Sequence, residues 1–244
     1  MIELSYAEGL ARWARRLELS PDDIQPLLAL PHAIQTVERD GFIVCEGERP
    51  TGCALLLGGS AFRLKVVNHG ARQIMAFHFP GEFVDLQNSL LSVNDHGVQA
   101  MTRCKLAVVP KKELAALLER EPGLMRAMWL DTLIEAALFR EWVVNVGRRN
   151  ARARLAHLLC ELAVRLEEFS RGDRNIEMPI TQEQIADATG MTSVHTNRTI
   201  QGLRKEGLIS LSGGRLVVHD WPALKAIGDF NELYLHRADK APEV

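Results

Sequence analysis

The feature that most constrains the fold is one continuous stretch in the second half of the chain, ITQEQIADATGMTSVHTNRTIQGLRKEGLI, residues 180–209. It predicts two short helices joined by a tight turn. Thr181 can cap the first helix, because Gln184 stands where a capping box needs an amide or a carboxylate. Gly190 supplies the turn, since a residue without Cβ tolerates a positive φ. Thr192 is placed to cap the second helix.

The second helix is predicted to run to about Lys205 and to have distinct inward and outward faces. Its inward positions follow i, i+4 and i+7 spacing and are Thr196, Ile200 and Leu203. Its outward positions gather near the N-terminus of the helix and are Ser193, Val194, Asn197 and Arg198. Between Gly190 and Lys205 the sequence contains no acidic residue. The outward face therefore carries no negative charge.

A helix with this face suits the major groove of DNA, whose base edges offer acceptors to Arg and paired sites to Asn. Two apolar segments, 208–211 and 215–218, surround a Ser-Gly-Gly turn and predict a two-stranded hairpin, which makes the unit a winged helix-turn-helix. The alternative is a helical hairpin with an ordinary solvated face. The residues predicted to contact DNA are Thr181, Thr192, Ser193, Val194, His195, Asn197, Arg198, Arg204 and Arg215.

Charge supports this prediction only locally. The formal net charge of the 244 residues is −2, which does not by itself indicate a polyanionic partner. Four arginines cluster just before the predicted DNA-binding unit: Arg148, Arg149, Arg152 and Arg154. Arg152 and Arg215 are the candidates for contacts with phosphate groups.

The first half of the chain has a different texture. Between residues 33 and 110, short apolar segments alternate with glycine-rich turns, which predicts an antiparallel sandwich or barrel. The predicted strands lie at 42–44, 54–57, 61–67, 73–79 and 106–109.

A long helix is predicted next, after a stop at Pro122-Gly123. Residues 124–146 contain no Gly or Pro and are apolar nearly all round, so two faces must be buried. One face would cover the β-rich half, and the other would meet a second copy of the chain, placing two DNA readers about 34 Å apart. A helix buried within a monomer is the alternative. The predicted dimer contacts are Leu130, Leu133, Ile134, Ala137 and Val144.

The predicted fold class is therefore α+β, with three parts. A β domain with flanking helices occupies 1–123, the dimerisation helix occupies 124–147, and the DNA-binding domain occupies 148–244. A hinge is expected at 147–150, where Asn150 can cap the following helix.

Several other classes of protein are disfavoured. The N-terminus carries an early acid and no long apolar run, and no segment approaches the ~20 apolar residues of a membrane span, so we expect a cytoplasmic protein without a membrane partner. An enzyme such as a metal-dependent cupin needs a His-x-His pair with a carboxylate, and no such pair occurs. We predict no enzyme activity, no metal and no cofactor. The cysteines show no ligand spacing and are expected to be reduced thiols, with a redox or metal role as the alternative: Cys45, Cys53, Cys104 and Cys160.

The order of these parts resembles the Crp/Fnr family of bacterial transcription regulators, from about residue 25 to 220. The resemblance rests on FHFPGEF at 77–83, on the long central helix, and most strongly on 180–209. It implies a homodimer in which a cyclic-nucleotide-binding-like β-roll controls two winged helices. Double-stranded DNA is the implied partner, and RNA polymerase is a further candidate.

The chain departs from its cyclic-nucleotide-binding relatives at three places. The Gly-Glu-Leu that grips the ribose is replaced by Asp85-Leu86-Gln87, and the Arg-Ser that meets the phosphate is replaced by His96-Gly97. The hydroxyls that receive the purine are replaced by Leu138 and Phe139. We therefore expect a degenerate nucleotide pocket with an unknown effector or none. A regulator that responds to cAMP or to another small molecule is the alternative.

Two other groups of relatives sense their signal through an iron–sulfur centre or a haem, and this sequence offers little support for either. Iron–sulfur relatives carry an N-terminal cysteine cluster, whereas no cysteine precedes Cys45. Haem relatives use axial ligands that His32, His69, His78 and His96 could supply in principle, although lone histidines on β-segments are more often surface or core residues. Cys45 and Cys53 are the candidates for a thiol switch.

The recognition helix also departs from the family. Many relatives show Glu, then Ser or Gly, then Arg; here Arg198 matches the Arg, while Val194 replaces Glu and Asn197 precedes the Arg. Valine cannot accept a hydrogen bond from cytosine, but it can pack on a thymine methyl group, and Asn can pair with adenine. We predict a palindromic site in which Arg198 reads a guanine and the neighbouring bases are altered.

Overall fold

The computed structural model describes residues 3–166 and 175–237, without the side chain of His69. The chain divides into two compact units that are not contiguous in sequence. The N-terminal unit is formed mainly by residues 3–65 and 76–137. The C-terminal unit is formed mainly by residues 138–234 together with the short segment 66–75.

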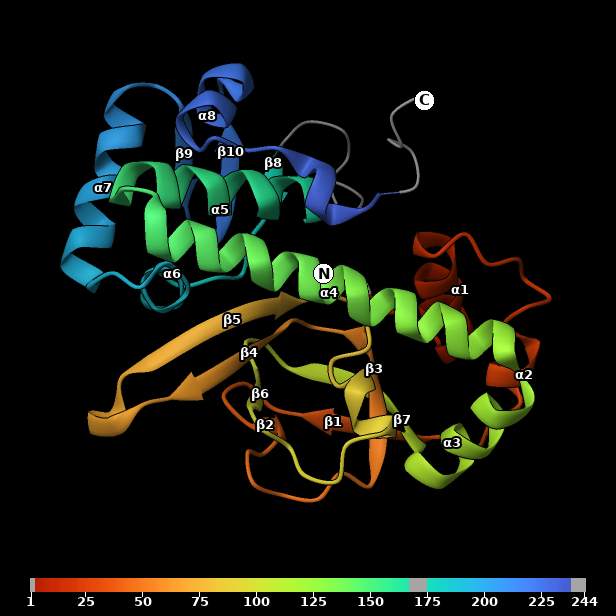
Figure 1. Ribbon diagram of the computed structural model, residues 1–244. Helices are drawn as coiled ribbons and strands as arrows, with labels where there is room; N and C mark the ends of the chain where they lie inside the picture. Colours follow the sequence, from red (N-terminus) through yellow and green to blue (C-terminus); the bar gives the residue numbers. More distant parts are fainter. Residues whose placement is uncertain (1–2, 167–174, 238–244) are drawn as a thin grey trace. The chain divides into compact units, whose positions relative to one another are not determined.

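Two antiparallel sheets make up the β-rich half. One has the strand order β1-β7-β3, and the other has the order β2-β6-β4-β5 (Figure 1). Strand β3 is buried along its whole length, which explains its unbroken apolar run. The strands are β1 Ala33–Val37, β2 Phe42–Val44, β3 Gly52–Gly58, β4 Ala61–Val66, β5 Arg72–His78, β6 Gly97–Ala100 and β7 Cys104–Pro110, with short 3₁₀ turns η1 Asn68–Gly70 and η2 Leu86–Ser89.

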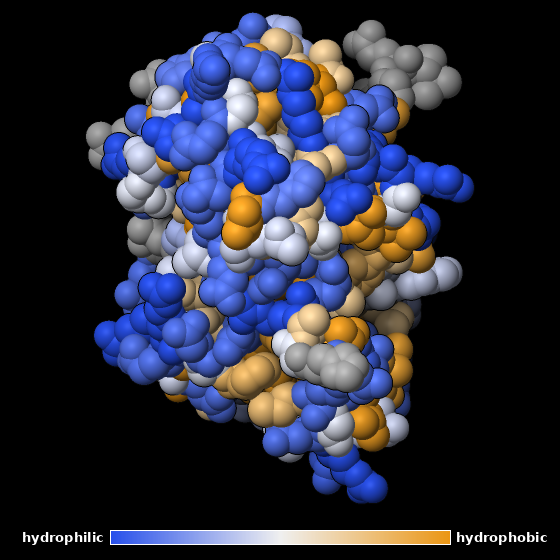
Figure 2. All heavy atoms as spheres, turned by 90° about the vertical axis from the view of Figure 1, so that its left-hand side faces the viewer, coloured by the Kyte–Doolittle hydropathy of each residue, from blue (hydrophilic) through white to orange (hydrophobic). Residues whose placement is uncertain are grey.

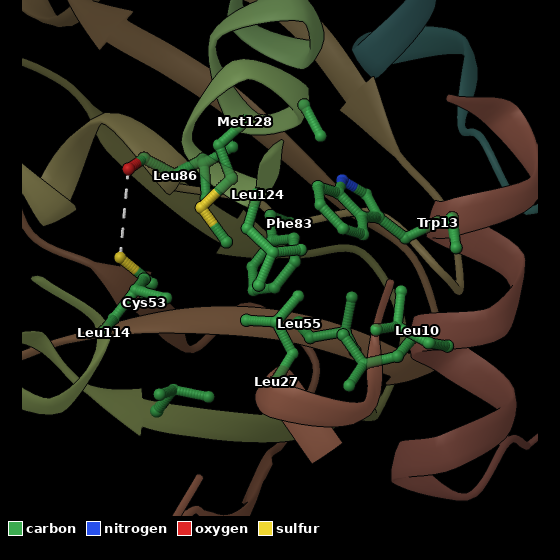
Figure 3. Close-up of a cluster of buried hydrophobic side chains, with 14 of the residues drawn as sticks. Leu10, Trp13, Leu27, Cys53, Leu55, Phe83, Leu86, Leu114, Leu124 and Met128 are labelled. Atoms are coloured by element: carbon green, nitrogen blue, oxygen red, sulfur yellow. Dashed lines mark hydrogen bonds between the residues drawn. The ribbon is translucent and has the colours of Figure 1, made fainter. Parts of the chain in front are cut away.

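Helices cover this sheet layer and complete its core. The helices are α1 Tyr6–Arg16, α2 Gln25–Leu28, α3 Lys111–Arg120 and α4 Pro122–Arg148. Ser5 and Glu8 form a capping box that starts α1. Trp13 of α1 donates its indole N–H to Asp131 Oδ2 of α4 over 2.8 Å, and its ring meets Phe83 edge-on. Figure 3 shows how side chains from α1, β3 and α4 converge around this tryptophan.

Helix α4 is longer than the sequence predicted. It begins at Pro122, although the Pro122-Gly123 pair was expected to end the preceding helix and delay the next. Proline suits the first helical position, where its missing N–H would have had no partner. The helix also runs through Gly147 to Arg148, and Asn150 Oδ1 then accepts from Ala153 N over 3.0 Å, as expected of the cap.

The C-terminal unit is built around one almost fully buried helix, α5 Ala151–Leu166. The other helices are α6 Gln182–Thr189, α7 Ser193–Lys205 and α8 Trp221–Ile227, with a 3₁₀ turn η4 at Glu232–Leu235. The wing has three strands in the order β8-β10-β9, where the sequence predicted two: β8 Asn175–Glu177, β9 Ile209–Ser212 and β10 Arg215–Val218.

Candidate nucleic-acid interface

The helix-turn-helix is shaped by three local backbone signals. Thr181 Oγ1 accepts from Gln184 N over 3.2 Å, and Gln184 Oε1 accepts from Thr181 N over 2.9 Å, so the predicted capping box is present. Gly190 ends α6 at φ +62°, a conformation that side chains with a Cβ rarely adopt. Thr192 Oγ1 then accepts from His195 N over 3.2 Å and starts α7. These signals fix the turn between the two helices.

Helix α7 presents the predicted outward face to solvent. The inward residues Thr196, Ile200 and Leu203 are all buried. Val194 is 71% exposed, so its isopropyl group is open to solvent. Figure 2 looks onto the side of the molecule that carries α7 and shows mainly hydrophilic side chains with isolated apolar spots. The exposed residues of this face are Ser193, Val194, His195, Asn197 and Arg198.

Most of the predicted arginine cluster is engaged within the chain. Arg149 lies 2.7 Å from a carboxylate of α4 and is largely buried. Arg152 pairs with Glu206, the residue that follows α7. Arg154 donates to two backbone carbonyls. Of the four, Arg148, at the end of α4, and Arg152 are exposed. Contact between Arg152 and a DNA phosphate would therefore have to compete with Glu206.

The remaining basic residues lie on the exposed surface of α7 and the wing. Arg204 and Lys205 occupy the last turn of α7, where positive charge favours the helix dipole. Arg215 begins β10 with its side chain 60% exposed, and its Nη2 lies 3.7 Å from Glu177 Oε1. This pair is exposed and loose, so it leaves Arg215 available to a phosphate group.

Helix α4 carries a second exposed feature, an apolar stripe. One face of α4 carries, in chain order, Trp129, Leu133, Ala136, Arg140 and Val143, with successive spacings of four, three, four and three residues. Ala136 is half-buried, and the other four are exposed. Such heptad-like spacing is typical of a helix that pairs with another. Trp129 and Val143 are the most exposed, at 66% and 68%.

The stripe differs from the predicted dimer contacts. Leu130, Leu133 and Val144 are exposed, but Ile134 and Ala137 are buried against their own chain and face away from solvent. Trp129 and Val143 are not among the predicted contacts, although the heptad spacing in the sequence includes both positions.

The interior of the N-terminal unit holds charged groups that already have protein partners. Arg63 is 3% exposed; its Nη1 lies 2.6 Å from Glu135 Oε1, and its Nη2 donates to Val84 O over 2.8 Å. Asp85 Oδ1 accepts from Ala54 N over 2.7 Å, and burial raises the pKa of the Asp85 carboxyl to about 7. An anion entering this interior would have to compete with Glu135 for the arginine.

At the other positions that depart from the cyclic-nucleotide-binding pattern, the side chains likewise contact neighbours within the protein. His96 Nδ1 lies 2.6 Å from Asp95 Oδ1, and its Nε2 lies 3.2 Å from Gln87 Nε2. Burial lowers the pKa of His96, so its imidazole offers no permanent cation to a phosphate. Leu138 and Phe139 are half-buried on α4.

The thiols and the remaining histidines have ordinary structural surroundings. Burial raises the pKa of Cys45, Cys53 and Cys104, which makes these thiols poor nucleophiles. His32 stacks on Tyr6, while the side chain of His69 lies outside the described structure. Over residues 3–166 and 175–237, no three His, Cys, Asp or Glu side chains are arranged to hold a metal ion. No helix in those ranges combines the length and apolarity of a membrane span.

Comparison with known proteins agrees with this architecture. Residues 34–121 match the model of the cyclic nucleotide-binding domain, and residues 153–227 match that of the Crp-like helix-turn-helix domain. The transcriptional activator protein FnrL of Cereibacter sphaeroides is 27% identical over 181 residues, covering 72% of each chain. The nitrogen fixation regulation protein FixK of Bradyrhizobium diazoefficiens is 27% identical over 164 residues, covering 67% of this chain and 68% of its own.

The fold also has close structural counterparts. The solved structure of FixK2 from Bradyrhizobium japonicum superimposes with a TM-score of 0.76 at 23% identity, covering 81% of this chain and 98% of that one. A c-di-GMP-responsive global regulator, CLP of Xanthomonas campestris, superimposes with a TM-score of 0.69 at 15% identity, covering 82% of this chain and all of that one. At these identities the likeness concerns the fold alone.

Proposed function

Because this chain belongs to the Crp/Fnr family of bacterial transcription regulators, we propose that it binds a palindromic promoter site as a homodimer. The observation that carries the proposal is the exposed N-terminal half of α7, which has side chains of types that can bind base edges, a capped start and no acidic residue. The relatives are transcription regulators, and we propose no enzymatic activity for this chain.

The heptad-spaced stripe on α4 supports the dimer. A second α4 packed along it would cover the indole of Trp129 and the isopropyl group of Val143, both now in water. The two-fold axis of such a pair would repeat each half-site contact, which is why the proposed site is palindromic. RNA polymerase remains a candidate partner of the DNA-bound dimer.

We further propose that each half-site contains a guanine read by Arg198. Arg pairs with guanine O6 and N7, Asn197 can pair with an adjacent adenine, and Val194 can pack on a thymine methyl group. The relatives with Glu, then Ser or Gly, then Arg in this helix read a TGA-type half-site. Selection of an unmodified TGTGA consensus by this protein would therefore contradict the part of the proposal that concerns Val194 and Asn197.

We propose that DNA binding needs no cyclic nucleotide. The support comes from the interior of the N-terminal unit, where Glu135 already neutralises Arg63 and where His96 carries no fixed charge. The alternative is a regulator that responds to cAMP or to another small molecule. Such a ligand would have to displace Glu135 or make its contacts elsewhere.

Selection of binding sites from random duplex DNA tests these proposals together. The purified, ligand-free protein is expected to enrich a two-fold symmetric motif, and added cAMP is expected to leave the motif and its enrichment unchanged. A motif that appears only with cAMP would overturn the ligand-independent reading. The absence of enrichment in both selections, for a protein that is folded by circular dichroism, would count against DNA binding without an effector.

A further inference from the structure

Three successive residues at the end of α6 are each held by a side chain from outside the helix-turn-helix. Asp187 accepts from Arg72, Ala188 accepts from Gln73, and Thr189 accepts from Arg154. All six residues belong to the C-terminal unit. Two of the donors come from a segment that lies more than a hundred positions earlier in the chain.

The contact with Arg72 is an ion pair with two-point geometry. Arg72 Nε lies 2.7 Å and Arg72 Nη2 lies 2.6 Å from Asp187 Oδ2. Both side chains are about three-quarters buried, at 26% and 20% exposure, so water screens the pair only partly. Glu183, one turn earlier on α6, lies 3.8 Å from the same guanidinium. Gln73 adds a longer hydrogen bond, 3.4 Å, to Ala188 O.

The contact with Arg154 closes the other side of the helix end. Arg154 Nη1 donates to Thr189 O over 2.7 Å, and Nη2 donates to Arg149 O over 3.1 Å. The carbonyls at a helix C-terminus have no partner within the helix, and a cation there is favoured by the helix dipole. Arg154 therefore ties the end of α6 to the start of the linker that follows α4.

These contacts meet at the turn that sets the direction of α7. A Cβ built on Gly190 would lie 3.7 Å from Arg154 Nη1 and 3.8 Å from Gln73 Oε1, so the two sets of side chains border the same residue. Helix α7 begins only three residues later, at Ser193. A small rotation of residues 187–189 would therefore be carried directly into the angle of α7.

We propose that Arg72 and Arg154 are positioning residues for DNA binding: they hold the end of α6 and so set the angle at which α7 meets the major groove. Neither residue contacts a base or a phosphate in this role. This inference rests on the proposed DNA-binding function and deepens it, because it assigns the geometry of the reader to side chains that lie outside the helix-turn-helix.

A charge exchange tests the role of Arg72 in the full-length protein. Arg72→Glu and Asp187→Arg are each expected to weaken binding to the selected duplex about tenfold, since a dimer carries the change twice, and the double variant is expected to recover most of the loss. The direction in which Asp187→Arg changes the affinity for DNA is decisive. It adds positive charge to the reader, so an effect of charge alone would strengthen binding to DNA.

The salt dependence and the base preference separate positioning from direct contact. Loss of a phosphate contact lowers the steepness of log K against log[salt] by about 0.9. The variants Arg72→Glu and Arg154→Lys are instead expected to keep the parental slope and the parental motif. Arg154→Lys keeps the charge but cannot span both carbonyls, so it is expected to weaken binding like the single exchanges. Arg103→Ala, which removes an exposed arginine paired with Glu38 at 3.2 Å, is the matched control and is expected to bind like the parent.

The outcomes distinguish this inference from the proposed function. If the parent protein selects no duplex, the proposed function fails. If the parent binds but the single exchanges bind equally well, or the double variant recovers nothing, the positioning role is overturned and the function stands. Thermal unfolding of each variant identifies any loss that comes from misfolding.

Discussion

The indole Nε1 of Trp142 lies 2.9 Å from Glu161 Oε2, so α4 and α5 are joined by a hydrogen bond that solvent does not reach. The same oxygen accepts from Tyr234 OH over 2.9 Å, and the other oxygen lies 3.4 Å from Arg165 Nη1. Burial raises the pKa of Glu161, while these donors favour its charged form. The carboxylate is thus the common acceptor for two helices and the C-terminal segment.

Removing one donor from this carboxylate should destabilise the C-terminal unit. Tyr234→Phe keeps the ring and deletes the hydroxyl, which leaves Glu161 buried with one partner fewer. We expect a loss of roughly 1–3 kcal/mol in the free energy of unfolding, measured by chemical denaturation and circular dichroism. The same substitution made in a Glu161→Gln background should cost clearly less, and equal costs in both backgrounds would contradict the coupling.

The stability of the same unit should depend on the pH through His157. Burial, aided by the nearby Arg149, lowers the pKa of His157 to about 4, while the unfolded chain keeps a value near 6.5. The unfolded state therefore binds more protons between these values, and the stabilising contribution of neutral His157 is present above 6.5 and is lost as the pH falls toward 4. The difference in unfolding free energy between the parent and His157→Gln should shrink by about 3 kcal/mol across this window. A constant difference would contradict the prediction.

Asp85 should give the stability of the N-terminal unit the opposite pH dependence. Its folded pKa of about 7 lies above the ordinary value near 3.8, so the folded state binds more protons and stability declines as the pH rises from about 4 to 7. Asp85→Asn mimics the protonated form, and Asn88, whose Oδ1 has no hydrogen-bond partner, can reverse its amide to accept from it. We expect the variant to be more stable than the parent by roughly 2–4 kcal/mol at pH 8 and equal to it near pH 3.5. A parental advantage at pH 8 would contradict the assignment.

Substitutions in α7 should distinguish a hydrogen bond to a base, proposed for Arg198, from an apolar contact with a base, proposed for Val194. Arg198→Ala should cost roughly 1–3 kcal/mol and relax the preference at one position of each half-site. Val194 should respond instead to the C5-methyl group of a base, so a duplex with uracil in place of the contacted thymine should bind the parent more weakly. The Val194→Ala variant should show a smaller penalty for uracil. Equal penalties in titrations with labelled duplexes would remove Val194 from the readout.

The apolar stripe on α4 should control assembly. Placing a charge in it by Trp129→Lys or Leu133→Lys should convert the proposed dimer to a monomer, because a buried unpaired ammonium is costly at a helix seam. Leu233→Lys, a substitution at another exposed apolar residue, is the matched control and should remain dimeric. Sedimentation velocity measures the mass directly, and three species of the same mass would contradict the assignment of the seam.

Local signals in the sequence were sufficient to predict the helix-turn-helix. The caps at Thr181 and Thr192 and the turn at Gly190 depend on neighbouring residues only, and the structure confirms all three. The five predicted strands lie within observed strands apart from their ends, because each contains an apolar run, although Phe42 of β2 is itself exposed.

Features that depend on distant partners were not predictable in the same way. Strand β1 has four exposed residues in five, so its pairing with β7 leaves no alternating pattern to find. Strand β8 has three residues and is defined by its pairing with β10. The burial of Ile134 and Ala137 depends on what the rest of the chain places against α4, and no sequence signal links Arg72 to Asp187.

Residues 66–75 comprise the end of β4, the turn after it and the first part of β5. They lie by sequence in the β-rich half, yet they group with the C-terminal unit that contains the helix-turn-helix. This arrangement limits how freely such proteins can exchange modules. A chimaera joined in the linker after α4 would receive its reader from one parent and residues 66–75 from the other, and it would lose the match between Arg72 and Asp187. Recombination between relatives should therefore succeed only when both segments come from the same parent, so the hairpin is inherited as part of the reader.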